Sequence, residues 1–348
     1  MNSPQFTLTS KFTNPFVPQK LPAICNLTQI GFHKYKSRWL KRLCKKFGRA
    51  AFDISYHRLG LGGKGRAILQ LPTGHVPLTF NARHLHFGAI YMAHYRDAYE
   101  SEVSSLLSIL LKGEKIFYDI GSNWGYFSFL AASLPNYNGQ IHAFEPSPNT
   151  FLDLKDMVSQ AKLNSRIKCH PRALSDKVGN ATMYVDSFSS GLDRILTQDI
   201  ISGGNKRVTI PLITIDNFDE NFADVIKIDV EGHEYQVLKG GRKKIQNKKP
   251  FIIMENWYDR DEKHTSLKPL QLLSQLDYTL FYPTWLIDGD PVPFDNHAYQ
   301  KLSYAACKQI RYTSFEPSDR CKLPDQVNIF ACPRNHVEEI LVQFKLVP

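Results

Sequence analysis

The chain has 348 residues, enough to bury the core of one large domain or of one domain with an extension. Hydrophobic residues make up 43% and charged residues 22%, a balance typical of globular rather than disordered proteins. No apolar run approaches the roughly 20 residues that span a bilayer, and prolines interrupt the N-terminal stretch where a secretory signal would lie. We therefore expect a cytoplasmic protein.

The formal net charge of +10 comes from the N-terminal fifth of the chain. Residues 1–66 contain 13 Lys and Arg against one acid, whereas the remaining residues contain 30 against 32. A nucleic-acid groove needs a basic surface, so this core is expected to have no nucleic-acid partner. The six cysteines lack the clustered spacing of a zinc site and are expected to remain thiols.

Residues 1–66 are predicted to form a basic extension, and residues 67–348 the domain itself. Residues 1–30 are rich in Pro, Thr and Asn and favour an extended arm with little fixed structure. Residues 32–49 predict an amphipathic helix with an aromatic and Leu face opposite a Lys and Arg face. Two interpretations remain open: the helix lies in an anionic membrane at its inner face, or its apolar stripe packs against the domain.

From about residue 100 strands and helices alternate, which is typical of a parallel sheet covered on both faces. The predicted strands are 116–120, 140–144, 167–174, 225–230, 251–254, 278–282 and 327–331. The predicted helices are 126–134, 147–161, 235–246 and 267–276, with a hairpin-like pair at 181–185 and 208–214. An irregular insertion is expected near 284–320, and long insertions at the end of a sheet are often functional.

The strongest local signal is a strand that runs into a Gly-rich turn and a helix, Tyr118-Asp-Ile-Gly-Ser-Asn-Trp-Gly125. Gly121 and Gly125 permit a tight turn and close approach of a ligand to the backbone. Glu145 ends the second strand, where a carboxylate can accept both hydroxyls of a ribose. The turn lacks the second glycine of a dinucleotide fingerprint. Asp119 would repel a pyrophosphate but suits a cofactor with a sulfonium and an ammonium; a nicotinamide-dependent oxidoreductase is the less favoured alternative.

A second signal follows the fourth strand, in Ile226-Lys-Ile-Asp-Val-Glu-Gly-His-Glu234. Ligands of open parallel sheets bind beyond the carboxyl ends of the strands. We therefore expect Asp229, Glu231 and His233 to lie near the Gly-rich turn. Glu234 is expected to be an ordinary first-turn acid, favoured by the helix dipole.

Five segments, in this order and spacing, resemble the FkbM methyltransferase family: Asp119-Ile-Gly-Ser-Asn-Trp-Gly125, Ala143-Phe-Glu-Pro-Ser-Pro148, Ala173-Leu-Ser-Asp176, Lys227-Ile-Asp-Val-Glu-Gly-His-Glu234 and Leu238-Lys-Gly-Gly241. The resemblance covers residues 98–257 well and the last two strands loosely. It implies an α/β fold of the class I methyltransferase type, a Rossmann-like seven-stranded sheet whose final strand, 327–331, is antiparallel.

The resemblance also implies S-adenosyl-L-methionine as the cofactor and methylation of a hydroxyl oxygen, commonly on a sugar of a glycolipid, polysaccharide or natural product. The residues expected to bind the cofactor are Asp119, Gly121, Asn123, Gly125, Glu145, Ala173, Leu174 and Asp229. A catalytically inactive scaffold with the same fold is an alternative, and the intact acids of the cofactor motifs argue against it.

An aliphatic hydroxyl is a poor nucleophile until a base removes its proton. His233 is the first candidate because an imidazole titrates near neutral pH, and Glu231 is the second, with Asp229 beside them. A divalent ion is the other possible activator. Mg²⁺ held by Asp229, Glu255 and Asn256 would have adequate hard oxygen ligands, so the metal question stays open.

Overall fold

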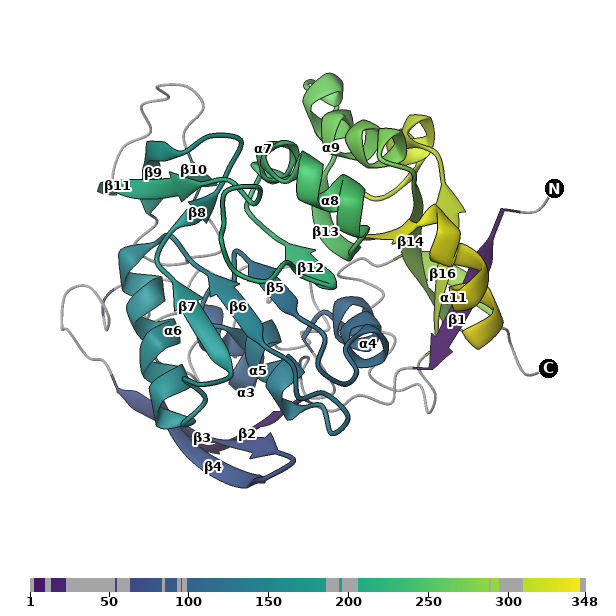
Figure 1. Cartoon of the computed structure of the whole chain (residues 1–348). Helices are drawn as coiled ribbons and strands as arrows, with labels where there is room; N and C mark the ends of the chain where they lie inside the picture. Colours follow the sequence, from purple (N-terminus) through teal and green to yellow (C-terminus); the bar gives the residue numbers. More distant parts are fainter. Residues whose placement is uncertain are drawn as a thin grey trace.

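The computed structural model describes residues 3–9, 14–22, 54, 63–82, 85–92, 95, 99–185, 194–195, 206–287, 289–293 and 309–344. A mixed sheet of ten strands runs through the molecule, with helices on both faces (Figure 1). A four-stranded sheet and a three-stranded sheet lie beside it. The predicted helix at 32–49 lies outside the described residues.

Seven neighbouring strands form the centre of the main sheet, in the order β7-β6-β5-β12-β13-β17-β14. Their bounds are β7 (Ile167–His170), β6 (Ile141–Phe144), β5 (Phe117–Ile120), β12 (Val225–Ile228), β13 (Phe251–Trp257), β17 (Gln326–Pro333) and β14 (Tyr278–Ile287). The first five are parallel, and β17 runs antiparallel between β13 and β14. This strand order defines the class I methyltransferase fold, which confirms the predicted fold class.

The main sheet is wider than the seven strands that were predicted. Beyond β14 it continues through β16 (Gln309–Phe315) to β1 (Gln5–Thr9), and β15 (Asp290–Pro293) pairs with the far part of β14. Two of these added strands lie within 284–320, which was expected to be irregular. Most described residues of that insertion therefore extend the sheet, and a 3-10 helix (Pro317–Lys322) follows β16.

Helices cover both faces of the sheet (Figure 1). On one face lie α4 (Ser101–Leu110), α5 (Tyr126–Ser133) and α6 (Pro148–Gln160), and on the other α7 (Glu234–Gly240), α8 (Arg242–Lys248) and α9 (Lys263–Gln275). The single helix predicted at 235–246 is therefore two, separated at Gly241. A Cβ at Gly241 would lie only 2.9 Å from the Cβ of Ile215. Close packing of the chain at this point thus requires a glycine.

The predicted third strand is divided between two sheets. β7 ends at His170, and β8 (Ala173–Leu174) leaves the main sheet to pair in parallel with β11 (Lys206–Ile213). β11 pairs antiparallel with β9 (Gly179–Val185), so the predicted hairpin-like pair is confirmed. β10 (Arg194–Ile195) completes this four-stranded sheet.

The described N-terminal residues are part of the fold rather than a loose arm. β1 closes the edge of the main sheet, and β2 (Phe16–Lys20), β3 (Lys64–Leu71) and β4 (Gly74–Asn81) form the three-stranded sheet. Phe16 lies edge-on to Trp124 of the Gly-rich turn, with ring centroids 5.3 Å apart. The boundary expected between residues 66 and 67 falls inside β3. The shorter helices are α3 (Gly88–Tyr91) and α11 (Val337–Gln343).

Candidate active site

The Gly-rich turn joins the carboxyl end of β5 to the start of α5. Gly121 and Gly125 have φ of 75° and 95°, in the left-handed region that favours glycine. A Cβ at Gly121 would lie 1.8 Å from the backbone oxygen of Asp229, so the turn lies directly against the end of β12. Asn123 is also left-handed, with φ of 53°. These conformations bring the turn and the fourth-strand motif together, as the sequence predicted.

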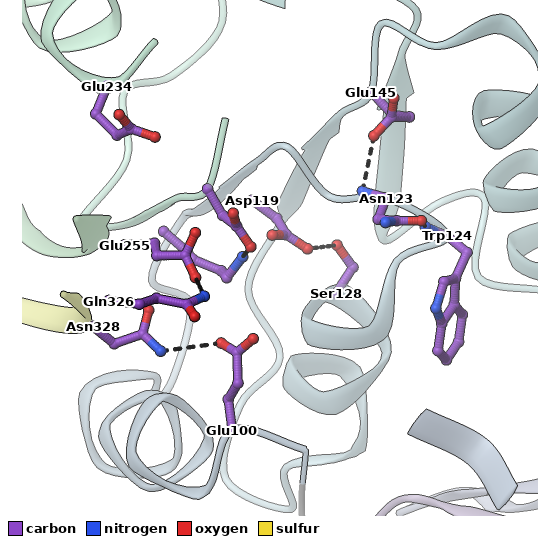
Figure 2. A network of polar contacts seen from close by, with 12 residues as sticks. Glu100, Asp119, Asn123, Trp124, Ser128, Glu145, Glu234, Glu255, Gln326 and Asn328 are labelled. Carbon is purple, nitrogen blue, oxygen red and sulfur yellow. Dashed lines mark hydrogen bonds and ion pairs between the residues drawn. The ribbon is translucent and has the colours of Figure 1, made fainter. Parts of the chain in front are cut away.

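Glu145 lies immediately after β6 and is fixed by two backbone amides. Its Oε2 accepts a hydrogen bond of 3.0 Å from the N–H of Asn123, and its Oε1 accepts one of 2.8 Å from the N–H of Ser147. Figure 2 shows the first of these contacts, which ties the acid to the Gly-rich turn. The side chain is buried. Its orientation is therefore set before any ligand arrives.

Two buried polar atoms, one in β5 and one in the turn that follows it, have no hydrogen-bond partner among the described residues: Asp119 Oδ1 and Ser122 Oγ. The other Asp119 oxygen accepts a 2.7 Å hydrogen bond from Ser128 Oγ. Burial raises the pKa of Asp119, while Lys227 and Ser128 act against the rise. Buried polar groups are nearly always satisfied in folded proteins. An acceptor oxygen and a hydroxyl left open in one turn therefore fit a ligand with polar, cationic character.

Ala173 and Leu174 form β8 and are both buried. Leu174 packs in the same apolar cluster as Phe144, the last residue of β6. The next residue, Ser175, contacts His233. The expected role of Ala173 and Leu174 in cofactor binding stays a prediction.

Three carboxyl groups meet at the ends of β12 and β13: Asp229, Glu231 and Glu255, here called the carboxyl cluster. One oxygen from each lies within 4.8 Å of the others. Burial, and then the charges of Asp229 and Glu255, raise the pKa of Glu231 to about 8. Burial and the charge of Asp229 likewise raise the pKa of Glu255. At neutral pH the cluster therefore holds protons that ordinary glutamates would have lost.

Lys227 supplies the positive charge nearest to the cluster. Its Nζ lies 3.0 Å from Asp229 Oδ2 and 4.6 Å from the centre of the Phe127 ring in α5. Burial alone would lower the pKa of this buried ammonium, but Asp229, Asp119 and other acids raise it well above its usual value. Lys227 therefore stays charged and joins the fourth-strand motif to the helix behind the Gly-rich turn.

Residues distant in sequence complete this side of the site (Figure 2). Asn328 donates to Glu100 Oε2 at 3.3 Å and to Glu102 Oε1 at 2.9 Å. Gln326 Nε2 donates to Glu255 Oε1. Burial raises the pKa of Glu100, with the charges of neighbouring acids adding to the effect and Lys227 opposing it. The two β17 amides thus hold carboxyl groups that are far apart in the sequence.

His233 takes a different position from its neighbours in the motif. Its Nε2 lies 2.9 Å from Ser175 Oγ, and its charge interactions are with Asp176 and Lys177 rather than with the carboxyl cluster. Burial lowers its pKa, so the imidazole is neutral at pH 7. Glu234 is not one of the three clustered carboxyls. Its side chain accepts a 3.0 Å hydrogen bond from the N–H of Gly232, as expected of a first-turn acid.

Asn256 does not join the group in which it was expected. Successive residues of a strand face opposite sides of the sheet, so Asn256 points away from Glu255. Its Oδ1 accepts a 2.6 Å hydrogen bond from Arg320 Nε, and its Nδ2 donates to Ser266 at 3.0 Å. Both residues also lie within β13, which is longer than predicted. Glu231 takes the place beside Asp229 and Glu255 that was expected for Asn256.

Several site residues were not identified from the sequence. Lys227 had a usable signal, because it is the one charged residue in a strand of apolar residues. Glu100 and the β17 amides had none, since they lie outside the motifs and reach the site only through the strand order. The unpartnered hydroxyl of Ser122 was not anticipated from the sequence either.

Comparison with known proteins agrees with this fold and these motifs. Residues 118–280 match the model of the Methyltransferase FkbM domain. The predicted resemblance to the FkbM methyltransferase family is therefore confirmed over these residues.

One curated relative is the hexuronic acid methyltransferase AglP of Haloferax volcanii. It is 28% identical over 161 residues, which cover 45% of this chain and 62% of AglP, so the match spans less than two thirds of that relative. Among solved structures, the Methyltransferase FkbM of Methylobacillus flagellatus is 17% identical with a TM-score of 0.38, covering 59% of this chain and 45% of that one. A SAM-dependent O-methyltransferase of Thermotoga maritima is 13% identical with a TM-score of 0.31, covering 71% and 76%.

Proposed function

We propose that this chain transfers a methyl group from S-adenosyl-L-methionine to a hydroxyl oxygen of a sugar. The observation that carries the cofactor assignment is the pair of unpartnered buried atoms, Asp119 Oδ1 and Ser122 Oγ, in a Gly-rich turn tied to Glu145. An ammonium and a carboxylate at one end of the cofactor and a ribose at the other match this donor and acceptor set. When bound, the cofactor supplies an electrophilic methyl group.

Each cofactor-side residue has a separate task in this proposal. Glu145 accepts hydrogen bonds from ribose hydroxyls, with its orientation fixed by the backbone N–H groups of Asn123 and Ser147. Asp119 and Asp229 offset positive charge, and the ion pair with Lys227 holds the Asp229 side chain in place. Gly121 and Gly125 let the turn approach the ligand closely.

The assignment of Glu145 is tested by Glu145→Ala. A charged hydrogen bond contributes about 1.5–3 kcal/mol, so we expect the affinity for S-adenosylhomocysteine to fall at least tenfold in calorimetry. Glu338→Ala, at an exposed position of α11, is the matched control and should bind normally. Unchanged affinity in a folded Glu145→Ala protein would remove this residue from the site.

On the acceptor side, Glu231 is better placed than His233 to remove the hydroxyl proton. Glu231 belongs to the carboxyl cluster, whereas His233 contacts Ser175. The raised pKa of Glu231 suits a base that must hold the proton it takes. A general base works best when its pKa lies near the pH at which the enzyme operates. Aligning the hydroxyl in line with the methyl group is the other contribution the protein makes.

Activation by Mg²⁺ is a second candidate. The carboxyl cluster offers the hard oxygen ligands that such an ion prefers, but Lys227 already neutralises one of them. We favour the metal-free route. Dialysis against EDTA should then leave activity unchanged, and loss of activity that Mg²⁺ restores would favour the ion instead.

The sugar acceptor is supported by the name of AglP, a hexuronic acid methyltransferase. Transfer of tritiated methyl groups from labelled cofactor into lysate fractions is the direct test. We expect label in polysaccharide, glycolipid or glycoside fractions. Label found only in protein or nucleic acid would exclude a sugar acceptor, and cofactor binding with no transfer to any fraction would favour an inactive scaffold.

Peripheral attachment to the inner face of a membrane remains a proposal for residues 32–49. No described helix combines the length and apolar character needed to cross a bilayer. Salt-sensitive sedimentation with anionic but not neutral vesicles would support attachment. The comparison protein should carry Lys41→Gln, Arg42→Gln and Lys45→Gln, since truncation at residue 67 would remove two strands of the fold.

A further inference from the structure

Trp257 combines wide exposure with a position at the candidate site. It ends β13, two residues after Glu255, and 49% of its surface is exposed. The other tryptophans of the described residues, Trp124 and Trp285, are buried. An indole left half in water contributes little to packing, so its place on the surface calls for another explanation.

The exposed indole is held in place by its polar edge. Its Nε1 donates a 2.9 Å hydrogen bond to Glu255 Oε2, while the other oxygen of Glu255 accepts from Gln326. Gln326 is also the residue opposite Trp257 in the β13–β17 pair. Trp257 is therefore a fixed aromatic surface one hydrogen bond away from the carboxyl cluster. The side chain of Val342, which is also exposed, has no polar group that could form such a tie.

A sugar ring matches this combination of groups. One face of a pyranose presents mainly C–H bonds, which pack against an aromatic surface, and its rim presents hydroxyls. Carboxyl groups next to that surface can accept hydrogen bonds from the hydroxyls, and protonated carboxyls can also donate them. A ligand with an extended apolar chain would pack against the indole but would leave the carboxyl groups without hydrogen-bond partners.

We propose that Trp257 is the platform on which a pyranose ring of the acceptor stacks, with the ring's hydroxyls directed toward Glu255 and the rest of the carboxyl cluster. This inference rests on the proposed function and narrows it, because it assigns the ring-binding surface. Trp257 is then a specificity-determining residue, and it takes no part in proton or methyl transfer.

Tryptophan fluorescence offers a direct binding measurement. Methyl β-D-glucopyranoside, methyl β-D-glucuronopyranoside and glycerol are titrated at millimolar concentration into the full chain with S-adenosylhomocysteine present. Subtracting the signal of Trp257→Phe isolates the emission of Trp257. We expect at least one pyranoside to change this emission and glycerol, which has hydroxyls but no ring face, to leave it unchanged. A change of equal size in Trp257→Phe would overturn the proposal.

Kinetics with the glycoside that accepts the methyl group provide the second measurement. Trp257→Ala should raise the acceptor KM at least tenfold with kcat changed less than threefold, and Trp257→Phe should retain most of the affinity because it keeps a stacking face. Val342→Ala, at an exposed apolar position of α11, is the control and should match the unmodified protein. S-adenosylhomocysteine affinity should be the same in all four proteins.

The outcomes separate this inference from the proposed function. If glycosides are methylated and Trp257→Ala keeps the original KM, the platform is excluded while the function stands. If the cofactor product binds but no glycoside accepts a methyl group or changes the emission, both fail. Loss of S-adenosylhomocysteine affinity in Trp257→Ala and Trp257→Phe would assign the indole to the cofactor side and also overturn the proposal.

Discussion

Glu231 has an unusual backbone conformation, with φ of 50° in a region that non-glycine residues seldom occupy. Strain of this kind persists only where the surrounding structure enforces it, and it is commonest at functional sites. Here it brings a third carboxyl beside Asp229 and Glu255. His233, two residues later, has no such contact and is neutral in its buried position. The pH dependence of activity can therefore show which of the two candidate bases is used, because their pKa values are shifted in opposite directions.

We predict that activity depends on pH in the way that Glu231 titrates. A carboxylate accepts a proton only when ionised, and a pKa raised to about 8 means that the ionised fraction grows as pH rises from 6.5 to 9. The acceptor kcat/KM should increase over that range. If His233 were the base, its lowered pKa would make it fully competent at pH 7, and the profile would be flat above that value.

Two substitutions complete this comparison. Glu231→Gln should lower turnover roughly 10²-fold and remove the rise with pH, while leaving S-adenosylhomocysteine affinity unchanged. His233→Gln, which can still hydrogen-bond to Ser175, should keep the increase of acceptor kcat/KM with pH. The reverse pattern would return the role of base to His233.

At the scale of elements, β1 is a five-residue strand whose apolar side chains are buried in the edge of the main sheet. Phe6 is 3% exposed and stacks on Tyr312 of β16 at 4.9 Å. Removing a buried phenylalanine side chain costs about 3–5 kcal/mol. We predict that Phe6→Ala lowers the free energy of unfolding by that amount in urea denaturation. Gln5→Ala, at an exposed position of the same strand, should change it by less than about 0.5 kcal/mol.

The contrast between β5 and β1 explains which elements the sequence could predict. Phe117–Ile120 is buried on both faces, so its apolar run and the following glycine turn identify it without any partner. β1 buries only Phe6 and Leu8, among polar residues in a segment rich in proline and threonine. Its identity as a strand depends on β16, more than 300 residues later. No local pattern contains that information.

The site divides in the same way. The Gly-rich turn, Glu145 and Asp229 were predictable because each directly follows a recognisable strand. The side of the sheet that Asn256 faces was not predictable. It depends on where β13 ends, and the strand continues to Trp257. Glu100 was out of reach of sequence reasoning, since it enters the site through Asn328 of β17.

Around Lys227 the described residues bury more carboxyl groups than cations, which makes the stability of the whole molecule depend on pH in the alkaline range. The folded-state pKa of Glu100, Glu231 and Glu255 is raised above the unfolded value of about 4.3. The folded state therefore binds more protons than the unfolded state between these values. Their contribution to stability is full below the unfolded pKa and is lost as pH rises through about 8.

We predict that Tm falls by roughly 2 °C or more between pH 7 and pH 9 in the absence of ligand. Glu255→Gln, which keeps an oxygen to accept from Gln326, should make this decline smaller. Glu338→Gln, at an exposed position, is the matched control and should follow the unmodified protein. A Tm independent of pH over this range would mean that these carboxyls titrate normally.

The position of β1 also has a consequence for the order in which the chain can fold. A growing chain emerges from the ribosome N-terminus first, yet residues 5–9 pair with residues 309–315. β1 must therefore wait until β16, about 300 residues later, has been synthesised before its backbone groups find their partner. α11 also packs against β1 at this edge (Figure 1). Contacts of such long sequence separation are slow to form, so β16 presents an open edge to other nascent chains until β1 pairs with it.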